Sequence, residues 1–274
     1  MGEITSLYVY KVISQASDGG ETRDLVEGLG LRPDGPVDAA RMVSSDAYYQ
    51  FFADLEARDP DGLRLPLKIG AAMKSDEYGA FGLAWKSAPN LRGSYTRSER
   101  YGRVLGSAEA YALEATEDGV FYTHEKAGEG SRGKLLSNEA SLSAVAQISS
   151  EVSSQPFVPK AVFFKHAARG DAAVYAQHLS CPVYLESARE ALLVDEAALD
   201  VPNKLGDETI ASFFDRHLEQ ELAAIPDQIG LEQRVRKAVA KLLSEGVPAL
   251  SAIAYELGMS ARTLQRRLSE TGHS

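Results

Sequence analysis

Three polar side chains near the C-terminus have the types and the spacing needed to read the edges of DNA bases. Arg262, Gln265 and Arg266 stand at i, i+3 and i+4, so a helix would direct them to one side. Arg can bind O6 and N7 of guanine through two hydrogen bonds, and Gln can bind N6 and N7 of adenine. The three side chains can therefore enter one major groove together, although a solvated helix face carries the same residue types.

The surrounding residues predict two short helices that would hold these side chains in place. Apolar residues at helical spacing predict a first helix with one buried face, formed by Leu250, Ile253, Ala254 and Leu257. Gly258 ends that helix, and Ser260 is a good N-cap for the next one. The buried face of the second helix is formed by Ala261, Leu264 and Leu268, with Met259 packed on Leu264. Two helices joined by a three-residue turn are typical of a helix-turn-helix.

The segment MSARTLQRRLSETGHS resembles the first helix-turn-helix of the AraC/XylS family of bacterial transcription regulators, and LSAIAYELG resembles its supporting helix. The resemblance runs from Glu232 to the C-terminus. It implies that the DNA-contacting positions are Ser260, Arg262, Thr263, Gln265, Arg266 and Arg267. Two departures stand out: Ala249 replaces the usual Ser or Thr cap, and the chain carries one of the family's two units.

Composition and charge are consistent with a cytoplasmic protein of two domains, and the AraC/XylS resemblance implies a bacterial one. The chain has 274 residues, 44% of them apolar, 25% charged and one of them a cysteine. The N-terminus is too polar for a secretory signal, and no apolar run is long enough to span a membrane, so we expect a cytoplasmic protein with no membrane partner. The net charge is −10, yet the segment 231–274 holds seven Lys or Arg and four acidic residues. So small an excess of positive charge predicts few contacts to DNA phosphates. We therefore expect DNA binding to require a homodimer or a second helix-turn-helix unit.

Upstream of the basic end, the hydrophobic pattern predicts an α+β domain with a helical first half and a small mixed sheet packed by helices on one face. Helices are expected over 3–16, 21–29, 37–58, 65–73, 77–86, 94–105, 138–153, 171–179, 207–223 and 232–243. Strands are expected over 110–116 and 119–126, paired as a hairpin, and over 160–166, 182–186 and 191–194.

This region also resembles the arabinose-binding-like N-terminal domain of one branch of AraC-family regulators. The segments that carry the resemblance are LVEGLGL, LPLKIGAAM, KAVFFKHAARGDAAVYAQHLSCPV and ALLVDEAALDVP, within roughly residues 10–220. The resemblance implies an effector-sensing or dimerisation domain, without implying that arabinose is the ligand. We therefore expect an effector domain over 1–223, a linker over 224–231 and an all-α helix-turn-helix unit over 232–274.

Candidate effector-binding residues are Arg97 and Arg100, which form a basic ridge on a predicted helix, and His166 at a strand end. Arg side chains at this spacing can grip an anionic ligand, although a solvated face is the default interpretation. His166 has a similar alternative as a hydrogen-bonded structural residue. The run YGAFGLAW at 78–85 is explained as well by core packing as by a pocket.

The remaining reactive residue types predict no catalysis, no metal site and no cofactor. His124 and Glu125 follow each other in a strand, so they point to opposite faces and cannot share a metal ion. Cys181 lacks a supporting motif, and we interpret it as a small buried hydrophobe. We therefore predict a DNA-binding transcription regulator controlled by a small molecule. Two alternatives stay open: a truncated effector-binding or dimerisation module that no longer holds operator DNA, and an enzyme built on a sensor fold.

Overall fold

The computed structural model describes residues 2–16, 22–107, 109–126, 130–225, 249–256 and 259–270, together with Val235 and Val239. The chain divides into two compact units, Met1–Ile225 and Pro226–Ser274. Both sheets in the described part of the chain belong to the first unit.

A five-stranded sheet forms the centre of the first unit, in the order β3-β4-β7-β5-β6. The strands are β3 (Glu109–Thr116), β4 (Gly119–Lys126), β5 (Ala161–Phe163), β6 (Val183–Tyr184) and β7 (Ala191–Val194). β5 and β6 pair in parallel, and the other neighbours are antiparallel. The predicted hairpin is confirmed: β3 and β4 pair from Glu109↔Lys126 to Thr116↔Gly119, and Gly119 adopts a φ of 134° that favours glycine.

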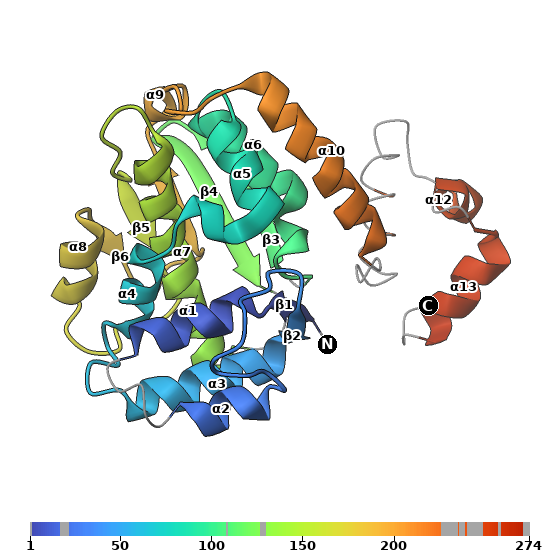
Figure 1. The fold of residues 1–274 in the computed structure, drawn as a ribbon. Helices are drawn as coiled ribbons and strands as arrows, with labels where there is room; N and C mark the ends of the chain where they lie inside the picture. The colour runs from blue at the N-terminus through green and yellow to red at the C-terminus, as the bar shows by residue number, and fades with distance from the viewer. Residues whose placement is uncertain are drawn as a thin grey trace. The chain divides into compact units, whose positions relative to one another are not determined.

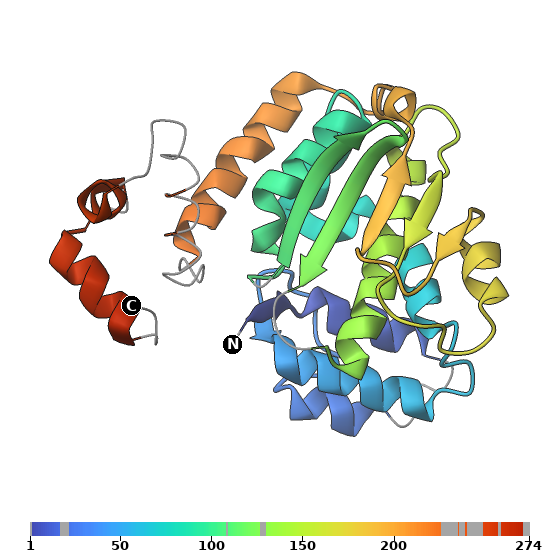
Figure 2. The same cartoon turned by 180° about the vertical axis from the view of Figure 1, so that it is seen from behind.

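One face of this sheet is covered by helices, as the α+β pattern predicted. The long helix α7 (Arg132–Val152) lies on β4 and β7, and α6 (Leu91–Tyr101) lies on β3. Figure 2 shows the strands from the opposite side, where no helix covers them in the described part of this unit. The side chains of β4 alternate accordingly, with Val120, Tyr122, His124 and Lys126 buried toward the helices. Glu125 is exposed on the other side of the strand, which confirms that it and His124 point apart.

The N-terminal segment forms a second hydrophobic cluster below the sheet (Figure 1). Its elements are β1 (Glu3–Thr5), α1 (Leu7–Gln15), α2 (Arg23–Gly28), β2 (Met42–Ser44), α3 (Ser45–Arg58) and α4 (Leu65–Ala71). Buried members of the cluster include Ile4, Val9, Val43, Phe52 and Leu136. α4 packs closely on α7, because Gly70 leaves room for the backbone and side chain of α7.

Two predicted helices are wrong at their starts. Glu3–Thr5 and Met42–Ser44 are not helical; they pair with each other as an antiparallel ribbon with Ile4 opposite Val43. The pairing partners lie far apart in the sequence, so helical periodicity in a local window cannot reveal them. The pairing of the two strands buries Ile4 and Val43 in the same hydrophobic cluster.

Further helices lie between α4 and β3, between β5 and β6, and after β7, and the last helix of the unit is longer than most of them. These elements are η1 (Ser75–Tyr78), α5 (Gly79–Ser87), α6, η2 (Gly102–Val104), α8 (Ala173–Leu179), α9 (Glu196–Leu199) and α10 (Glu208–Ala224). Asp207 caps α10 by accepting hydrogen bonds from the backbone N–H groups of Thr209 and Ile210 at 2.8 and 3.1 Å. α10 packs against α5, so the last helix of the unit rests on one of its inner helices.

Two helices of the second unit are described: α12 (Leu250–Glu256) and α13 (Ala261–Glu270). Their buried contact consists of Ile253, Ala254 and Leu264, and partly buried apolar side chains pack around it from Val235, Val239, Met259, Ala261 and Leu268. The predicted helix over 232–243 lies outside the described residues except for Val235 and Val239, as do Leu257, Gly258 and positions 226–231 of the expected linker. Among the helices that the structure describes, none is long and apolar enough to cross a membrane.

Candidate functional site

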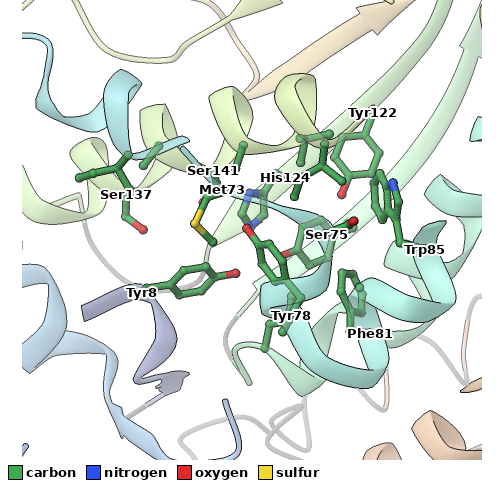
Figure 3. Close-up of a pocket in the computed structure, with 18 of the residues that line it drawn as sticks. Tyr8, Met73, Ser75, Tyr78, Phe81, Trp85, Tyr122, His124, Ser137 and Ser141 are labelled. Atoms are coloured by element: carbon green, nitrogen blue, oxygen red, sulfur yellow. The ribbon is translucent and has the colours of Figure 1, made fainter. Parts of the chain in front are cut away.

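A mainly apolar cavity lies inside the first unit. It is bounded by α1, by η1 and α5, by α7, and by the β3–β4 hairpin, and it also reaches Tyr48 of α3. Figure 3 shows Tyr8, Tyr78 and His124 directed into the same space from three of these elements. A concave apolar site with a few convergent polar groups is the usual form of a small-molecule pocket.

One part of the aromatic wall comes from the run YGAFGLAW, which spans the end of η1 and most of α5. Tyr78, Phe81 and Trp85 recur at helical spacing and all line the cavity, together with Gly82. A Cβ on Gly82 would lie 1.7 Å from the backbone oxygen of Ser75, so only glycine lets α5 fold back this closely on η1. The same rings continue into the core, because Trp85 packs on Tyr95 with centroids 5.3 Å apart. This run therefore serves both packing and the cavity, the two alternatives that its sequence left open.

The polar end of the cavity is built by two cross-strand pairs of the hairpin. Tyr111 stands opposite His124, and their rings stack with centroids 4.3 Å apart. Glu109 stands opposite Lys126, with 3.6 Å between Oε1 and Nζ, and both side chains are buried. Glu109 also accepts a hydrogen bond of 2.5 Å from the Tyr111 hydroxyl. Antiparallel register thus brings four polar side chains to one place on the inner face of the sheet.

Lys126 and Glu109 form a mutually compensating ion pair beside the cavity. Burial alone would raise the pKa of Glu109, but the Lys126 ammonium and the hydrogen bond from the Tyr111 hydroxyl hold that pKa at about 2. Lys126 donates hydrogen bonds of 2.6 and 3.0 Å to the hydroxyls of Ser137 and Ser141, which line the cavity. Burial lowers the pKa of His124, so its imidazole is neutral near pH 7.

The tyrosine hydroxyls of the cavity are neutral over the whole physiological range. Burial raises the pKa of Tyr8, Tyr78, Tyr111 and Tyr122 well above the ordinary value for a phenol. Each of them therefore acts as a neutral hydrogen-bonding group. The cavity combines aromatic surface with uncharged polar atoms.

The three residues predicted to bind an effector lie outside this cavity. Arg97 forms a two-point ion pair with Asp215 of α10, with Nε–Oδ1 and Nη2–Oδ2 distances of 2.9 and 2.8 Å. Arg100 pairs with Glu219 of the same helix. The basic ridge of α6 is therefore occupied by acidic side chains of α10, a long-range pairing that helical spacing alone cannot identify.

His166 belongs to a buried polar network around Glu139 of α7. Its Nδ1 lies 2.7 Å from the carbonyl oxygen of Ala167, and its Nε2 lies 3.3 Å from Glu139 Oε1. Arg169 binds both oxygens of Glu139 at 2.8 and 2.6 Å, and the Tyr175 hydroxyl donates to the same carboxylate at 2.9 Å. This placement matches the structural alternative for His166. Cys181 is buried as expected, and burial raises the pKa of its thiol to about 11.

Sequence reasoning did not identify the residues that line the cavity. Tyr8, Tyr48 and Tyr111 carry no motif, and His124 drew attention only as a metal ligand to be excluded. The one available signal was the stripe of rings and small residues at 78–85. Within the described part of the chain, no group of three or more His, Cys, Asp or Glu side chains is placed to hold a metal ion.

The second candidate surface is the outer side of α13. Arg262, Gln265 and Arg266 are exposed, while Leu264 between them is fully buried against α12. Ser260 is exposed and caps the helix, since its hydroxyl accepts a 3.2 Å hydrogen bond from the backbone N–H of Thr263 and lies 2.8 Å from the Thr263 hydroxyl. Thr263 is half-buried, and the side chain of Arg267 lies outside the described residues. One short helix therefore presents the three predicted base-reading side chains to solvent.

Comparison with known proteins identifies the family. Residues 19–203 match the family model described as the arabinose-binding domain of AraC transcription regulators, N-terminal. The HTH-type transcriptional regulator VirS of Mycobacterium tuberculosis, in strains CDC 1551 and H37Rv, is 27% identical over 254 residues, which cover 91% of this chain and 71% of VirS. The crystal structure of the transcriptional regulator CdpR from Pseudomonas aeruginosa has a similar fold, with a TM-score of 0.53 and 16% identity over 97% of this chain and 80% of CdpR. The predicted resemblance is confirmed, and the chain belongs to the AraC family of transcription regulators, whose N-terminal effector-binding domain it carries.

Proposed function

We propose that this chain is a sequence-specific DNA-binding regulator controlled by a small molecule that occupies the cavity. The observation that carries the proposal is the outer side of α13, where Arg262, Gln265 and Arg266 are exposed around the buried Leu264. The packing of Leu264 on Ile253 and Ala254 would hold the helix at a constant angle to α12. Such a pair of helices can place the second one in a major groove, as a helix-turn-helix does.

The proposed contacts divide into two kinds. Arg262, Gln265 and Arg266 would read base edges, because Arg and Gln each make two hydrogen bonds to a purine. Ser260, Thr263 and Arg267 would bind phosphate oxygens, contacts that orient a protein on DNA without reading its sequence. The unit would occupy 232–274, joined by a linker over 224–231 to the effector domain over 1–223. The boundary between the two compact units after Ile225 supports this division.

Helix α5 contacts both the cavity and α10, so it could transmit the effect of a bound ligand toward the linker. α5 supplies Phe81 and Trp85 to the cavity wall, and the same helix packs against α10, the last helix before the linker. Asn203, in the segment that leads into α10, donates hydrogen bonds to the carbonyl of Ala88 and the hydroxyl of Ser94 at 2.8 and 2.9 Å. A ligand that favours one position of α5 would therefore change the population of α10 arrangements.

One helix-turn-helix unit with few basic residues would bind DNA weakly, and formation of a homodimer would strengthen that binding. The exposed apolar side chains of Ile210 and Phe213 on α10 support this part of the proposal. A two-fold dimer would present two copies of α13 to two half-sites of an operator, with a separation set by the geometry of the dimer. A regulator of this kind would act in the bacterial cytoplasm, where the chromosome is found.

The experiment first identifies an operator by selection with the purified chain and then measures the affinity of the chain for that operator. Genomic fragments retained by the purified chain are sequenced, and fluorescence anisotropy then measures affinity for the selected site and a scrambled site at two salt concentrations. Arg266→Ala and Gln265→Ala are each expected to weaken specific binding by ~1–3 kcal/mol and to leave scrambled-site binding nearly unchanged. Arg32→Ala, an exposed arginine of the first unit, is the matched control and should bind as the unchanged chain does. Equal affinities for the two sites, or unchanged binding by both α13 variants, would refute the proposed DNA contact.

A further inference from the structure

The charge of the cavity wall restricts what the cavity can hold. Among the described residues that line it, there is no Asp, Glu, Lys or Arg. Three charged groups contact the wall from behind: Glu109 and Lys126 compensate each other across 3.6 Å, and Glu151 is bound by the Ser75 hydroxyl at 2.8 Å. A ligand with a formal charge would lose its hydration on entry and find no counter-charge, so the wall favours uncharged molecules.

Four of the eight hydroxyl groups on the wall, those of Ser75, Tyr111, Ser137 and Ser141, already bind polar groups of the protein. The Ser75 hydroxyl donates to Glu151 at 2.8 Å, and the hydroxyls of Ser137 and Ser141 accept from Lys126. The Tyr111 hydroxyl donates to Glu109. A sugar or another polyol needs many hydrogen-bond partners at once. The four occupied hydroxyls reduce the number of partners that such a ligand could use.

Two buried side chains on the wall do have unused hydrogen-bonding atoms. Trp85 is 4% exposed, and within the described structure its Nε1 has no hydrogen-bond partner. His124 is 2% exposed, and neither of its ring nitrogens has one, since Nε2 lies 3.5 Å from Glu109 without a well-formed hydrogen bond. Buried donors without partners are rare in folded proteins and are expected to be satisfied by a ligand.

We infer that the cavity binds an uncharged, mainly apolar ring compound that carries an oxygen able to accept a hydrogen bond from Trp85 Nε1. The inference rests on the proposed function in taking this cavity as the effector site. Flat rings suit the wall, because Tyr78 at the end of η1 and Phe81 and Trp85 of α5 line it with aromatic rings. His124 lies at the polar end, where a neutral imidazole can donate one hydrogen bond and accept another. The ligand is thus recognised by shape, neutrality and one or two hydrogen bonds.

The test uses three probes of nearly equal shape: methyl naphthyl ketone, naphthoate and ethylnaphthalene. The ketone is neutral with an acceptor oxygen, naphthoate is anionic, and ethylnaphthalene has no acceptor. Calorimetric titration of the full chain is expected to give an affinity for the ketone at least about ten-fold above that for naphthoate. Trp85 is the single tryptophan of the chain, so its fluorescence reports directly whether a probe occupies the cavity.

Variants test the hydrogen bond and the location. Trp85→Phe keeps an aromatic ring and removes the N–H, so the preference for the ketone over ethylnaphthalene is expected to fall by about five-fold. This ratio compares two ligands on one variant, so it does not depend on the variant's stability. Ala144→Leu adds bulk to the cavity wall and is expected to weaken all neutral probes, while Ala173→Leu, at an exposed position of α8, is the matched control.

The inference is overturned by any of three results: naphthoate binding as tightly as the ketone, an unchanged ratio in Trp85→Phe, or no binding of the ketone up to its solubility limit. These outcomes are independent of DNA binding, which is measured without any probe. A chain that prefers the ketone but ignores operator DNA would support this inference and refute the proposed function. A chain that binds its operator and shows no preference for neutral probes would support the proposed function and refute this inference.

Discussion

Asp215 of α10 holds the guanidinium of Arg97 on α6 through two hydrogen bonds of 2.9 and 2.8 Å. The side chains are 12% and 25% exposed, so the pair is largely shielded from water. It therefore anchors the last helix of the first unit on the helix that borders the sheet. A two-point arginine–carboxylate pair of this kind is stronger and more directional than a single contact.

Arg97→Ala is expected to destabilise the first unit by ~1–3 kcal/mol, because Asp215 would remain partly buried without its partner. Amide hydrogen exchange should increase mainly in α10, and urea unfolding gives the free energy. Arg100→Ala provides the matched control, since its pair with Glu219 is exposed and should contribute less than ~1 kcal/mol. Equal losses for the two variants would contradict the role given to the shielded pair.

Arg169→Met should be far more damaging than its position in a loop suggests. The variant would leave the carboxylate of Glu139 buried with Tyr175 and His166 as its remaining partners. The free energy of unfolding is therefore expected to fall by ~3–5 kcal/mol. Chemical denaturation measures this value. Arg132→Met is the control, because that side chain is half-exposed in its pair with Glu56, and we expect a change below ~1 kcal/mol. A mild effect of Arg169→Met would show that the network contributes little.

The buried carboxylate of Glu109 predicts a loss of stability in acid. Its folded-state pKa of about 2 lies below the ordinary value of 4.5, so its contribution is complete above pH 4.5. That contribution is lost as the pH falls from 4.5 toward 2, and it amounts to ~3 kcal/mol. Denaturant midpoints measured across this window should fall more steeply for the unchanged chain than for Glu109→Gln. Parallel curves would show that Glu109 does not titrate as described.

Gly82→Ala should distort the cavity wall. The added Cβ would lie 1.7 Å from the Ser75 oxygen, so η1 and α5 must separate, at an expected loss of ~2 kcal/mol or more. The fluorescence of Trp85, three residues away on the same wall, should shift as water enters. Gly93→Ala in α6 is the contrasting case: the nearest atom to the added Cβ is Nη1 of Arg97 at 3.3 Å, which needs to move by only a few tenths of an ångström, so a smaller loss of stability than for Gly82→Ala is expected.

Features that depend on neighbouring residues could be predicted from the sequence. The hairpin of β3 and β4 follows from alternation around Asp118-Gly119, and α12 and α13 follow from apolar residues at helical spacing. The exposure of Arg262, Gln265 and Arg266 opposite Leu264 likewise follows from a period of 3.6 residues. Periodicity fails for the ribbon of Glu3–Thr5 and Met42–Ser44, whose strands are stabilised only by each other.

The cavity, in contrast, was decided by tertiary structure. Tyr8, Trp85, His124 and Ser141 come from four separate elements, and no local pattern records that their side chains meet. The same holds for Arg97, whose type and spacing suited an anionic ligand but whose partner is Asp215, more than a hundred residues later. Sequence by itself determined the family, the hairpin and the polar face of α13, because these depend on short-range periodicity and type. The position of the cavity and the partners of the buried charges depended on long-range packing, which sets the distances between residues that the chain keeps far apart.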